Sequence, residues 1–384
     1  MKVAIIHYWL VGMRGGEKVL EALCEMYPTA DIFTHVMSAD DISSRLKSHR
    51  IQTSFIARLP GATRWYKRYL PLMPLALEHL DLRGYDLIIS SESGPAKGVI
   101  PPAGAVHVCY CHSPMRYIWN MYHEYRVETD LFTRLAMPIL SHYLRLWDQS
   151  SAARVDGFVA NSHNVAQRVR RYYRRDADIV HPPIDVDAFE VVHRNEVGDA
   201  FLMVGELVRY KRPDLAVEAF NASGRRLVVI GGGEMLGELR RIARPNVTIL
   251  GPQPFDVLRH HYARSRALIF PGEEDFGIVP VEAMASGCPV IAFARGGALE
   301  TVLDRVTGVH FEEQSIVSLN LAVDEFDRLT FEPGTLRAQA RRFALGRFKR
   351  QMQASIDRCV NAERRLVQGV PVAPSDVGRG RVVA

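Results

Sequence analysis

Short apolar runs alternate with helical patterns along the whole chain, and this alternation starts afresh in its second half. An apolar run, a helix and a further apolar run are typical of a parallel sheet covered by helices. In the first half the predicted strands are 2–7, 31–35, 86–90, 106–111, 157–161 and 178–181. In the second half they are 200–204, 227–231, 247–250, 267–270, 289–293 and 309–311. The sequence therefore predicts an α/β protein with two Rossmann-like domains.

The length of 384 residues suits two domains of ordinary size. A polar and charged stretch, 190–199, interrupts the alternation and reads as a linker. We therefore expect domains at 1–190 and 191–366. The last residues, 367–384, are rich in Gly, Pro, Val and Ser without periodicity, and we expect a mobile tail there.

The composition is that of a soluble globular protein, with 47% hydrophobic and 24% charged residues. No apolar run approaches the roughly 18 residues that span a bilayer. The first apolar run is interrupted at His7, which favours a strand over a secretory signal. The five cysteines are scattered and form no metal-ligand quartet. We expect reduced thiols, no metal site and a cytoplasmic location.

The net charge of +5 does not indicate nucleic-acid binding, but two segments combine cations with aromatic residues. Segment 55–69 contains no acid and is open to two interpretations, contact with an anionic membrane surface or a solvated helix face. The membrane interpretation places the protein peripherally at the inner face of the plasma membrane. For the second segment, 168–175, a solvated helix face is favoured.

The most informative stretch follows the predicted strand 267–270 and leads into a helix. Pro280 falls in the first turn of that helix, where its missing N–H costs no hydrogen bond. Gly277 permits close approach of a ligand to the backbone, and the free N–H groups of a helix N-terminus attract phosphate. Glu274 and Glu282 are eight positions apart, so that one can bind a sugar hydroxyl and the other a ribose diol. A helix-capping role for either carboxylate is the alternative.

The whole phrase resembles that of the retaining family-four glycosyltransferases of the GT-B fold, also called glycosyl transferases group 1. Their pattern E-x-F-G-x-x-x-x-E-A-M-A-x-G-x-P-V is matched here by Glu274, Phe276, Gly277, Glu282, Ala283, Met284, Ala285, Gly287, Pro289 and Val290. The resemblance extends over about residues 1–365. It implies two Rossmann-like domains facing across a cleft, a nucleotide-sugar donor, transfer with retention, and neither metal nor cofactor.

The resemblance also assigns site residues. It implies catalytic roles for Glu274, His112 and Lys211, and Arg209 is a further candidate at a point where the sequence departs from the family. It implies donor contacts for Gly15, Gly16, Asp275, Phe276, Gly277, Ile278, Val279 and Glu282. Gly15 and Gly16 belong to a glycine-rich turn after the first strand, and this turn is not the G-x-G-x-x-G dinucleotide fingerprint.

His112 stands in the phrase Tyr110-Cys111-His112-Ser113-Pro114 at the end of a predicted strand. The family carries a functional histidine near the transferred sugar at this place, so His112 is a candidate for binding the sugar or orienting the acceptor. Function concentrates at the carboxyl ends of strands in such sheets. The alternative is a histidine that caps the following helix.

The family usually reads Gly-Arg-Leu followed by a lysine after the first strand of its second domain. Lys211 matches that lysine, but Glu206 stands in place of the arginine. A carboxylate repels phosphate. Arg209 is the candidate for the missing cation. Two further glycine-rich turns, Gly231–Gly233 and Gly296–Gly297, also match the family and are expected to border the donor.

The implied chemistry breaks a sugar–phosphate bond while Lys211, Arg209 and a helix N-terminus stabilise the leaving diphosphate. No D-x-D metal motif stands in a suitable place. The opening His7-Tyr8-Trp9-Leu10 is similar to that of bacterial O-antigen and exopolysaccharide mannosyltransferases. This similarity implies GDP-mannose as donor and a glycan or polyprenyl-linked saccharide as acceptor. A nucleotide-sugar epimerase and a non-catalytic nucleotide-sugar-binding subunit remain alternatives.

Overall fold

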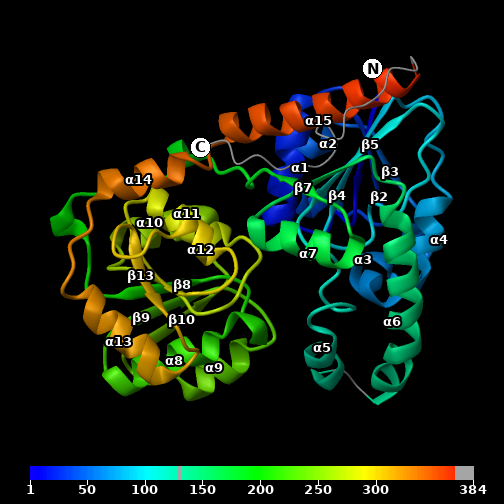
Figure 1. Cartoon of the computed structure of the whole chain (residues 1–384). Helices are drawn as coiled ribbons and strands as arrows, with labels where there is room; N and C mark the ends of the chain where they lie inside the picture. Colours follow the sequence, from blue (N-terminus) through cyan, green and yellow to red (C-terminus); the bar gives the residue numbers. More distant parts are fainter. Residues whose placement is uncertain (129–130, 368–384) are drawn as a thin grey trace. The chain divides into compact units, whose positions relative to one another are not determined.

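The computed structural model describes residues 1–128 and 131–367. The chain forms two compact units, which Figure 1 shows in one cartoon. Among the described residues, unit 1 consists of those up to Pro182 and those from Phe348 to Val367, and unit 2 of Pro183–Arg347. This division differs from the expected domains 1–190 and 191–366 at both ends. The expected linker, 190–199, lies within unit 2.

Unit 1 is built on a seven-stranded parallel sheet in the order β3-β2-β1-β4-β5-β6-β7. Its strands are β1 (Val3–His7), β2 (Asp31–Thr34), β3 (Ile51–Thr53), β4 (Leu87–Glu92), β5 (Val106–Cys111), β6 (Gly157–Ala160) and β7 (Ala177–Ile179). The six predicted strands are present. The edge strand β3 was missed because its three residues are only partly buried and carry no apolar pattern.

The helices of unit 1 follow the strands in the βα alternation. They are α1 (Gly15–Met26), α2 (Ser44–Lys47), α3 (Ala62–Trp65), α4 (Met73–Glu78), α5 (Tyr122–Glu128), α6 (Leu131–Ala152) and α7 (His163–Tyr173). The first helix begins where it was predicted, since Val19, Leu20 and Leu23 are buried on one face. Segment 168–175 is solvated only in part, because Arg168 is buried and donates to Ser113 Oγ at 3.3 Å.

The last helix, α15 (Leu345–Val367), explains why the second domain ends earlier than expected. From Phe348 onward it belongs to unit 1. The rings of Phe348 and Tyr110 lie 5.7 Å apart, and Lys349 Nζ lies 2.5 Å from Glu25 Oε2. An amphipathic pattern does not reveal which unit a helix covers. The expected tail, 367–384, lies outside the described residues except for Val367, which ends α15.

Unit 2 contains a six-stranded parallel sheet in the order β10-β9-β8-β11-β12-β13. Its strands are β8 (Phe201–Val204), β9 (Leu227–Ile230), β10 (Val247–Gly251), β11 (Leu268–Phe270), β12 (Val290–Phe293) and β13 (Gly308–Phe311), all of them predicted. Its helices are α8 (Pro213–Ser223), α9 (Leu236–Ile242), α10 (Phe255–Arg264), α11 (Ile278–Ala285), α12 (Ala298–Thr301), α13 (Ile316–Phe326) and α14 (Pro333–Arg341).

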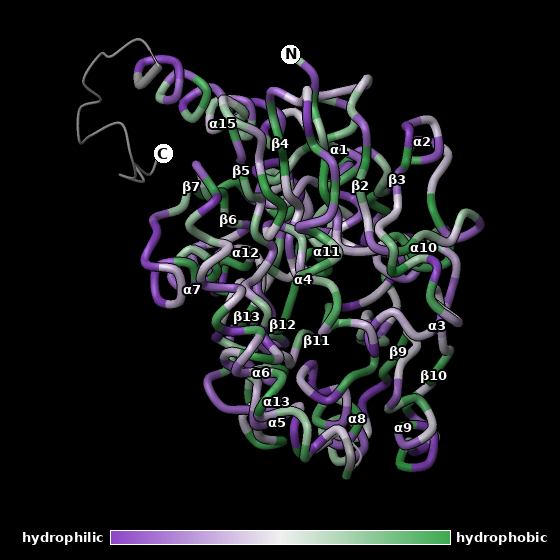
Figure 2. The backbone as a smooth tube through the Cα atoms, turned by 90° about the vertical axis from the view of Figure 1, so that its right-hand side faces the viewer, coloured by the Kyte–Doolittle hydropathy of each residue, from purple (hydrophilic) through white to green (hydrophobic). Residues whose placement is uncertain are grey.

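The sheet of unit 2 is buried on both faces, as expected for parallel strands. Phe201 and Met203 pack into one apolar cluster with α8 and α13, whereas Leu202 packs into a second cluster with α11 and α14. Figure 1 shows these helix pairs on opposite sides of the sheet. Figure 2 shows hydrophobic residues along β9, β11 and β12. Among the described residues, no helix is long and apolar enough to cross a membrane.

A buried ion cluster fixes the loop after β4 in unit 1. The side chains of Lys97, Glu92 and Asp148 are fully buried. Lys97 Nζ lies 2.8 Å from Glu92 Oε1 and also contacts Asp148. Trp119 and Tyr173 donate to Asp148 Oδ2 at 2.7 and 2.9 Å. Burial acts to lower the pKa of Lys97, but the two carboxylates outweigh it and the pKa is raised, so the ammonium stays charged.

Replacing Lys97 by Met should strongly destabilise unit 1, because two carboxylates then stay buried without their cation. The expected loss is about 3–5 kcal/mol of the free energy of unfolding. All four tryptophans lie in unit 1, so the urea midpoint followed by tryptophan fluorescence measures it. Arg83→Ala removes the exposed Arg83–Asp81 pair and is the control, expected to leave the midpoint unchanged. Equal midpoints for the two variants would contradict the argument.

Candidate active site

In unit 2, the predicted catalytic residues Lys211 and Glu274 lie together. Lys211 Nζ is 3.0 Å from Glu274 Oε1, and the two side chains are 16% and 19% exposed. Lys211 ends the short turn Arg209–Lys211 after β8, and Glu274 lies in the loop between β11 and α11. Burial acts to lower the pKa of Lys211, but the Glu274 carboxylate outweighs it and the pKa is raised. Lys211 is therefore a cation at neutral pH.

Close backbone contacts fix the loop that carries Glu274. A Cβ on Gly272 would lie 2.6 Å from the Cα of Lys211, so the two loops touch through backbone atoms. The N–H of Gly297 donates to the carbonyl of Glu274 at 2.9 Å. Gly296 has φ +62°, and a Cβ there would lie 2.4 Å from the same carbonyl oxygen. The turn Gly296–Gly297 therefore positions the Glu274 backbone.

Helix α11 begins after Gly277, whose φ of +79° is in the left-handed region. Pro280 lies in its first turn, as predicted, and the predicted donor residues Asp275–Val279 make up the loop end and this helix start. Glu282, also in α11, accepts a hydrogen bond from Tyr262 Oη at 2.9 Å. Tyr262 is fully buried, which raises its pKa and keeps it a donor. Tyr262 was not predicted as a site residue, because the sequence around it shows only the helical spacing of α10.

The turn Gly231–Gly233 packs on the loop after β8. A Cβ on Gly231 would lie 1.8 Å from the carbonyl oxygen of Gly205, and the amide of Leu207 donates to the carbonyl of Gly232 at 2.8 Å. Arg209 lies 3.8 Å from Glu238 of α9, through Nη2 and Oε2. That Arg209 compensates for Glu206 stays a prediction.

In unit 1, the predicted residue His112 directly follows β5 and contacts Ser91 of the neighbouring strand β4. Ser91 Oγ, in β4, lies 2.9 Å from His112 Nε2 and 3.1 Å from His7 Nδ1. His7 ends β1 and pairs in register with Ser91. His7 Nε2 lies 3.6 Å from Glu17 Oε1 in α1. Burial lowers the pKa of His112 to about 3, so its ring is neutral at pH 7.

The predicted Gly15–Gly16 turn starts α1 and lies against this cluster. A Cβ on Gly16 would lie 2.1 Å from Tyr8 Oη, whereas one on Gly15 would meet open space. Glu17 Oε2 accepts from the N–H of Arg14 at 2.9 Å. Burial acts to raise the pKa of Glu17, but His7 and the backbone donors outweigh it and the pKa is lowered. The carboxylate is therefore ionised at neutral pH.

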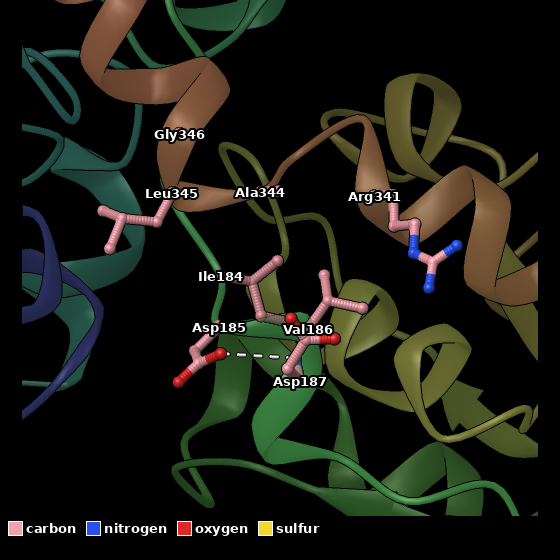
Figure 3. A pocket seen from close by; sticks show the side chains of 8 residues that line it. All are labelled: Ile184, Asp185, Val186, Asp187, Arg341, Ala344, Leu345 and Gly346. Atoms are coloured by element: carbon pink, nitrogen blue, oxygen red, sulfur yellow. Dashed lines mark hydrogen bonds between the residues drawn. The ribbon is translucent and has the colours of Figure 1, made fainter.

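One pocket lies away from the predicted site. It has a volume of about 350 Å³ within unit 2 and is lined by Ile184, Asp185, Val186, Asp187, Arg341, Ala344, Leu345 and Gly346. Figure 3 shows these residues and the hydrogen bond by which Asp185 accepts from the Asp187 amide at 3.2 Å. None of the predicted catalytic or donor-binding residues lines this pocket. The described part of the chain contains no group of His, Cys, Asp and Glu side chains suited to a metal ion.

Two family models match the chain, one for each half. Residues 13–188 match the model of Glycosyltransferase Family 4, and residues 187–342 match that of Glycosyl transferases group 1. The fold and these matches define a two-unit α/β protein of the GT-B class. Within this class, each half of the chain is similar to a glycosyltransferase family, the first half to family 4 and the second half to group 1.

Solved structures share the fold. The Anabaena protein HepE in complex with UDP and glucose matches with a TM-score of 0.68 and 14% identity, over 93% of this chain and 99% of that one. The lipopolysaccharide outer core galactosyltransferase WaaB, in its apo form, matches with a TM-score of 0.65 and 14% identity over the same shares. At this identity the likeness concerns the fold alone.

A curated relative is the D-inositol 3-phosphate glycosyltransferase of Mycobacteroides abscessus, which is 32% identical over 186 residues. The match covers 42% of this chain and 42% of that protein. The chain therefore spans less than half the length of this relative.

The contact between Gly272 and the Lys211 backbone can be tested by a single methyl group. Gly272→Ala should lower the free energy of unfolding by about 1–3 kcal/mol, because backbone atoms must move apart. Gly237→Ala in α9 is the control, since a Cβ there meets nothing within 4 Å. Circular dichroism in urea measures both variants. If Gly272→Ala is as stable as the control, the loops do not touch in this way.

Proposed function

We propose that this chain transfers a hexose from a nucleotide-sugar to a saccharide acceptor, with retention at the anomeric carbon and without a metal ion. The observation that carries the proposal is the Lys211–Glu274 pair, 3.0 Å apart and partly exposed. Lys211 precedes α8 and Glu274 lies in the loop that leads to α11. A cation, a carboxylate and a helix N-terminus are the groups needed to hold a diphosphate and a sugar.

The proposed reaction breaks the bond between the anomeric carbon and the diphosphate oxygen, and the acceptor hydroxyl forms the new glycosidic bond. Negative charge grows on the leaving diphosphate. The Lys211 ammonium and the N–H groups at the start of α11 would stabilise this charge. Glu274 would bind hydroxyls of the sugar and Glu282 the ribose diol. Tyr262 would keep the Glu282 carboxylate in place.

The donor we propose is GDP-mannose, because the opening His7-Tyr8-Trp9-Leu10 is similar to that of bacterial mannosyltransferases. UDP-sugars are the competing donors, since HepE was solved in complex with UDP-glucose. For the acceptor we propose a glycan or a polyprenyl-linked saccharide of a cell-surface polysaccharide. The name of the mycobacterial relatives makes inositol phosphate a second acceptor to test.

The proposed location is the cytoplasm, with peripheral contact at the inner face of the plasma membrane. Segment 55–69 supports the contact, because its cations stand at the surface beside an exposed tryptophan. They are Arg58, Arg64, Lys67 and Arg68. The guanidinium of Arg68 lies 5.5 Å from the ring of Trp65, which is 41% exposed. Exposed cations next to aromatic rings suit an anionic lipid surface.

A thermal-shift panel with GDP, UDP, GDP-mannose and UDP-glucose tests the donor. A ligand at 100 times its dissociation constant should stabilise the protein by about 2.7 kcal/mol. We expect the shift with the guanosine nucleotides, and a shift with the uridine nucleotides alone would contradict GDP-mannose. Transfer of mannose to a lipid-linked acceptor should persist in EDTA. Conversion of the donor without any acceptor would indicate an epimerase instead.

The Lys211–Glu274 pair predicts opposite effects of two substitutions on nucleotide binding. Lys211→Met should weaken nucleoside diphosphate binding about 10- to 100-fold, as expected for loss of a charged partner. Glu274→Gln should leave or improve that binding, because Lys211 no longer has a competing carboxylate, but lower the transfer rate about 100- to 1,000-fold. Calorimetry measures the binding, and nucleotide release with acceptor measures the rate. Weaker diphosphate binding in Glu274→Gln would contradict the assigned roles.

A further inference from the structure

A continuous line of buried polar side chains leads from the start of α1 to His112. Glu17 is 3% exposed, His7 1% and Ser91 0%. Ser91 Oγ lies between the two histidines, at 3.1 Å from His7 Nδ1 and 2.9 Å from His112 Nε2. At the other side of the His7 ring, Nε2 makes no hydrogen bond and lies 3.6 Å from Glu17 Oε1.

The negative charge of Glu17 determines which groups along this line donate a hydrogen and which accept one. A neutral imidazole has one N–H and one acceptor nitrogen, and a hydroxyl donates one hydrogen while accepting another. If His7 carried its hydrogen on Nδ1, the lone pair of Nε2 would face the Glu17 carboxylate inside the protein, where repulsion is poorly screened. The hydrogen of a neutral His7 therefore lies on Nε2, which points to Glu17.

The positions of the hydrogens on Ser91 and His112 follow from the position of the hydrogen on His7. His7 Nδ1 is then an acceptor, so the Ser91 hydroxyl donates to it. Ser91 Oγ in turn accepts from His112 Nε2, the only role left for that contact. His112 is neutral at pH 7, so its Nδ1 carries no hydrogen. Nδ1 can accept a hydrogen bond from a hydroxyl group.

We propose that Glu17, a neutral His7 and Ser91 are positioning residues that hold His112 as the tautomer with its hydrogen on Nε2, so that Nδ1 accepts a hydrogen bond from a hydroxyl of the bound sugar or acceptor. This inference rests on the proposed function in that it assigns a ligand to Nδ1. The tautomer itself does not depend on any ligand.

The backbone explains why this arrangement is rigid. Glu17 Oε2 is held by the N–H of Arg14, which leaves Oε1 facing His7. His7 and Ser91 are register partners in adjacent parallel strands, and the His112 amide donates to the carbonyl of Glu92 at 2.7 Å. The three strand ends therefore fix the side chains without help from a mobile loop.

Nitrogen-15 NMR of histidine-labelled protein reads the tautomer directly, and His112→Asn assigns the signals of His112. In the native protein we expect the hydrogen of His112 on Nε2. Glu17→Gln should produce a mixture of both tautomers or the opposite one, and Ser91→Ala should release His112 from a single tautomer. Ser91→Thr keeps the hydroxyl and should retain the native spectrum. A hydrogen on Nδ1 in the native protein, or a Glu17→Gln spectrum identical to the native one, would overturn the proposal.

The neighbouring serine supplies a matched control. Ser90 Oγ lies 2.9 Å from His107 Nε2 in the same two strands, is equally buried, and takes no part in the line to His112. Ser91→Ala and Glu17→Gln should lower the turnover number about 10- to 100-fold, as displaced catalytic groups do, with unchanged nucleotide affinity. Ser90→Ala should leave turnover unchanged, and an equal loss in that variant would overturn the positioning role. A native protein that transfers no sugar but shows the expected tautomer would instead refute the proposed function alone.

Discussion

The arrangement of the site depends on one constraint, the parallel register of the strands. In a parallel sheet all carboxyl ends meet at the same edge, so residues far apart in sequence become neighbours. His7, Ser91 and His112 stand at the ends of β1, β4 and β5, which are adjacent in the sheet. In unit 2, Lys211 and Glu274 follow β8 and β11, which are also adjacent. Within each unit, the grouping of the candidate residues is thus a consequence of strand order.

Strand order alone does not determine the conformation of the loops. Close packing between backbone atoms does. Gly272, Gly297 and Gly16 each occupy a place where a Cβ would lie 2.6 Å or less from a neighbouring atom. At Gly272 and Gly297 the neighbour is backbone, which cannot turn aside as a side chain can. The loops that carry Lys211 and Glu274 are therefore held at a spacing that only glycine permits. Gly272 and Gly297 therefore help to position the charged residues.

Strands and site residues that stand in a local residue pattern could be predicted from the sequence. Features that depend on contacts between residues distant in sequence were missed. Twelve strands followed from apolar runs, and β3 did not, because a three-residue edge strand lacks such a run. Glu274, Lys211 and His112 stand within recognisable phrases, and the structure places Lys211 beside Glu274. The partners Tyr262 and Ser91 were missed, since they lie 20 and 21 positions from the residues they contact. The packing of α15 on unit 1 was missed for the same reason.

Two ion-paired lysines, Lys97 and Lys211, differ in what their charges can do. Lys97 contacts two carboxylates and lies 4.6 Å from the ring of Tyr173, with no exposed surface. No ligand can reach it, so its charge can only stabilise the fold. Lys211 lies 3.0 Å from the Glu274 carboxylate and remains 16% exposed. A partly solvated pair of this kind can exchange its carboxylate for a phosphate at little cost in free energy, because the cation is neutralised before and after. The difference in exposure, rather than the residue type, separates the structural lysine from the one suited to bind a ligand.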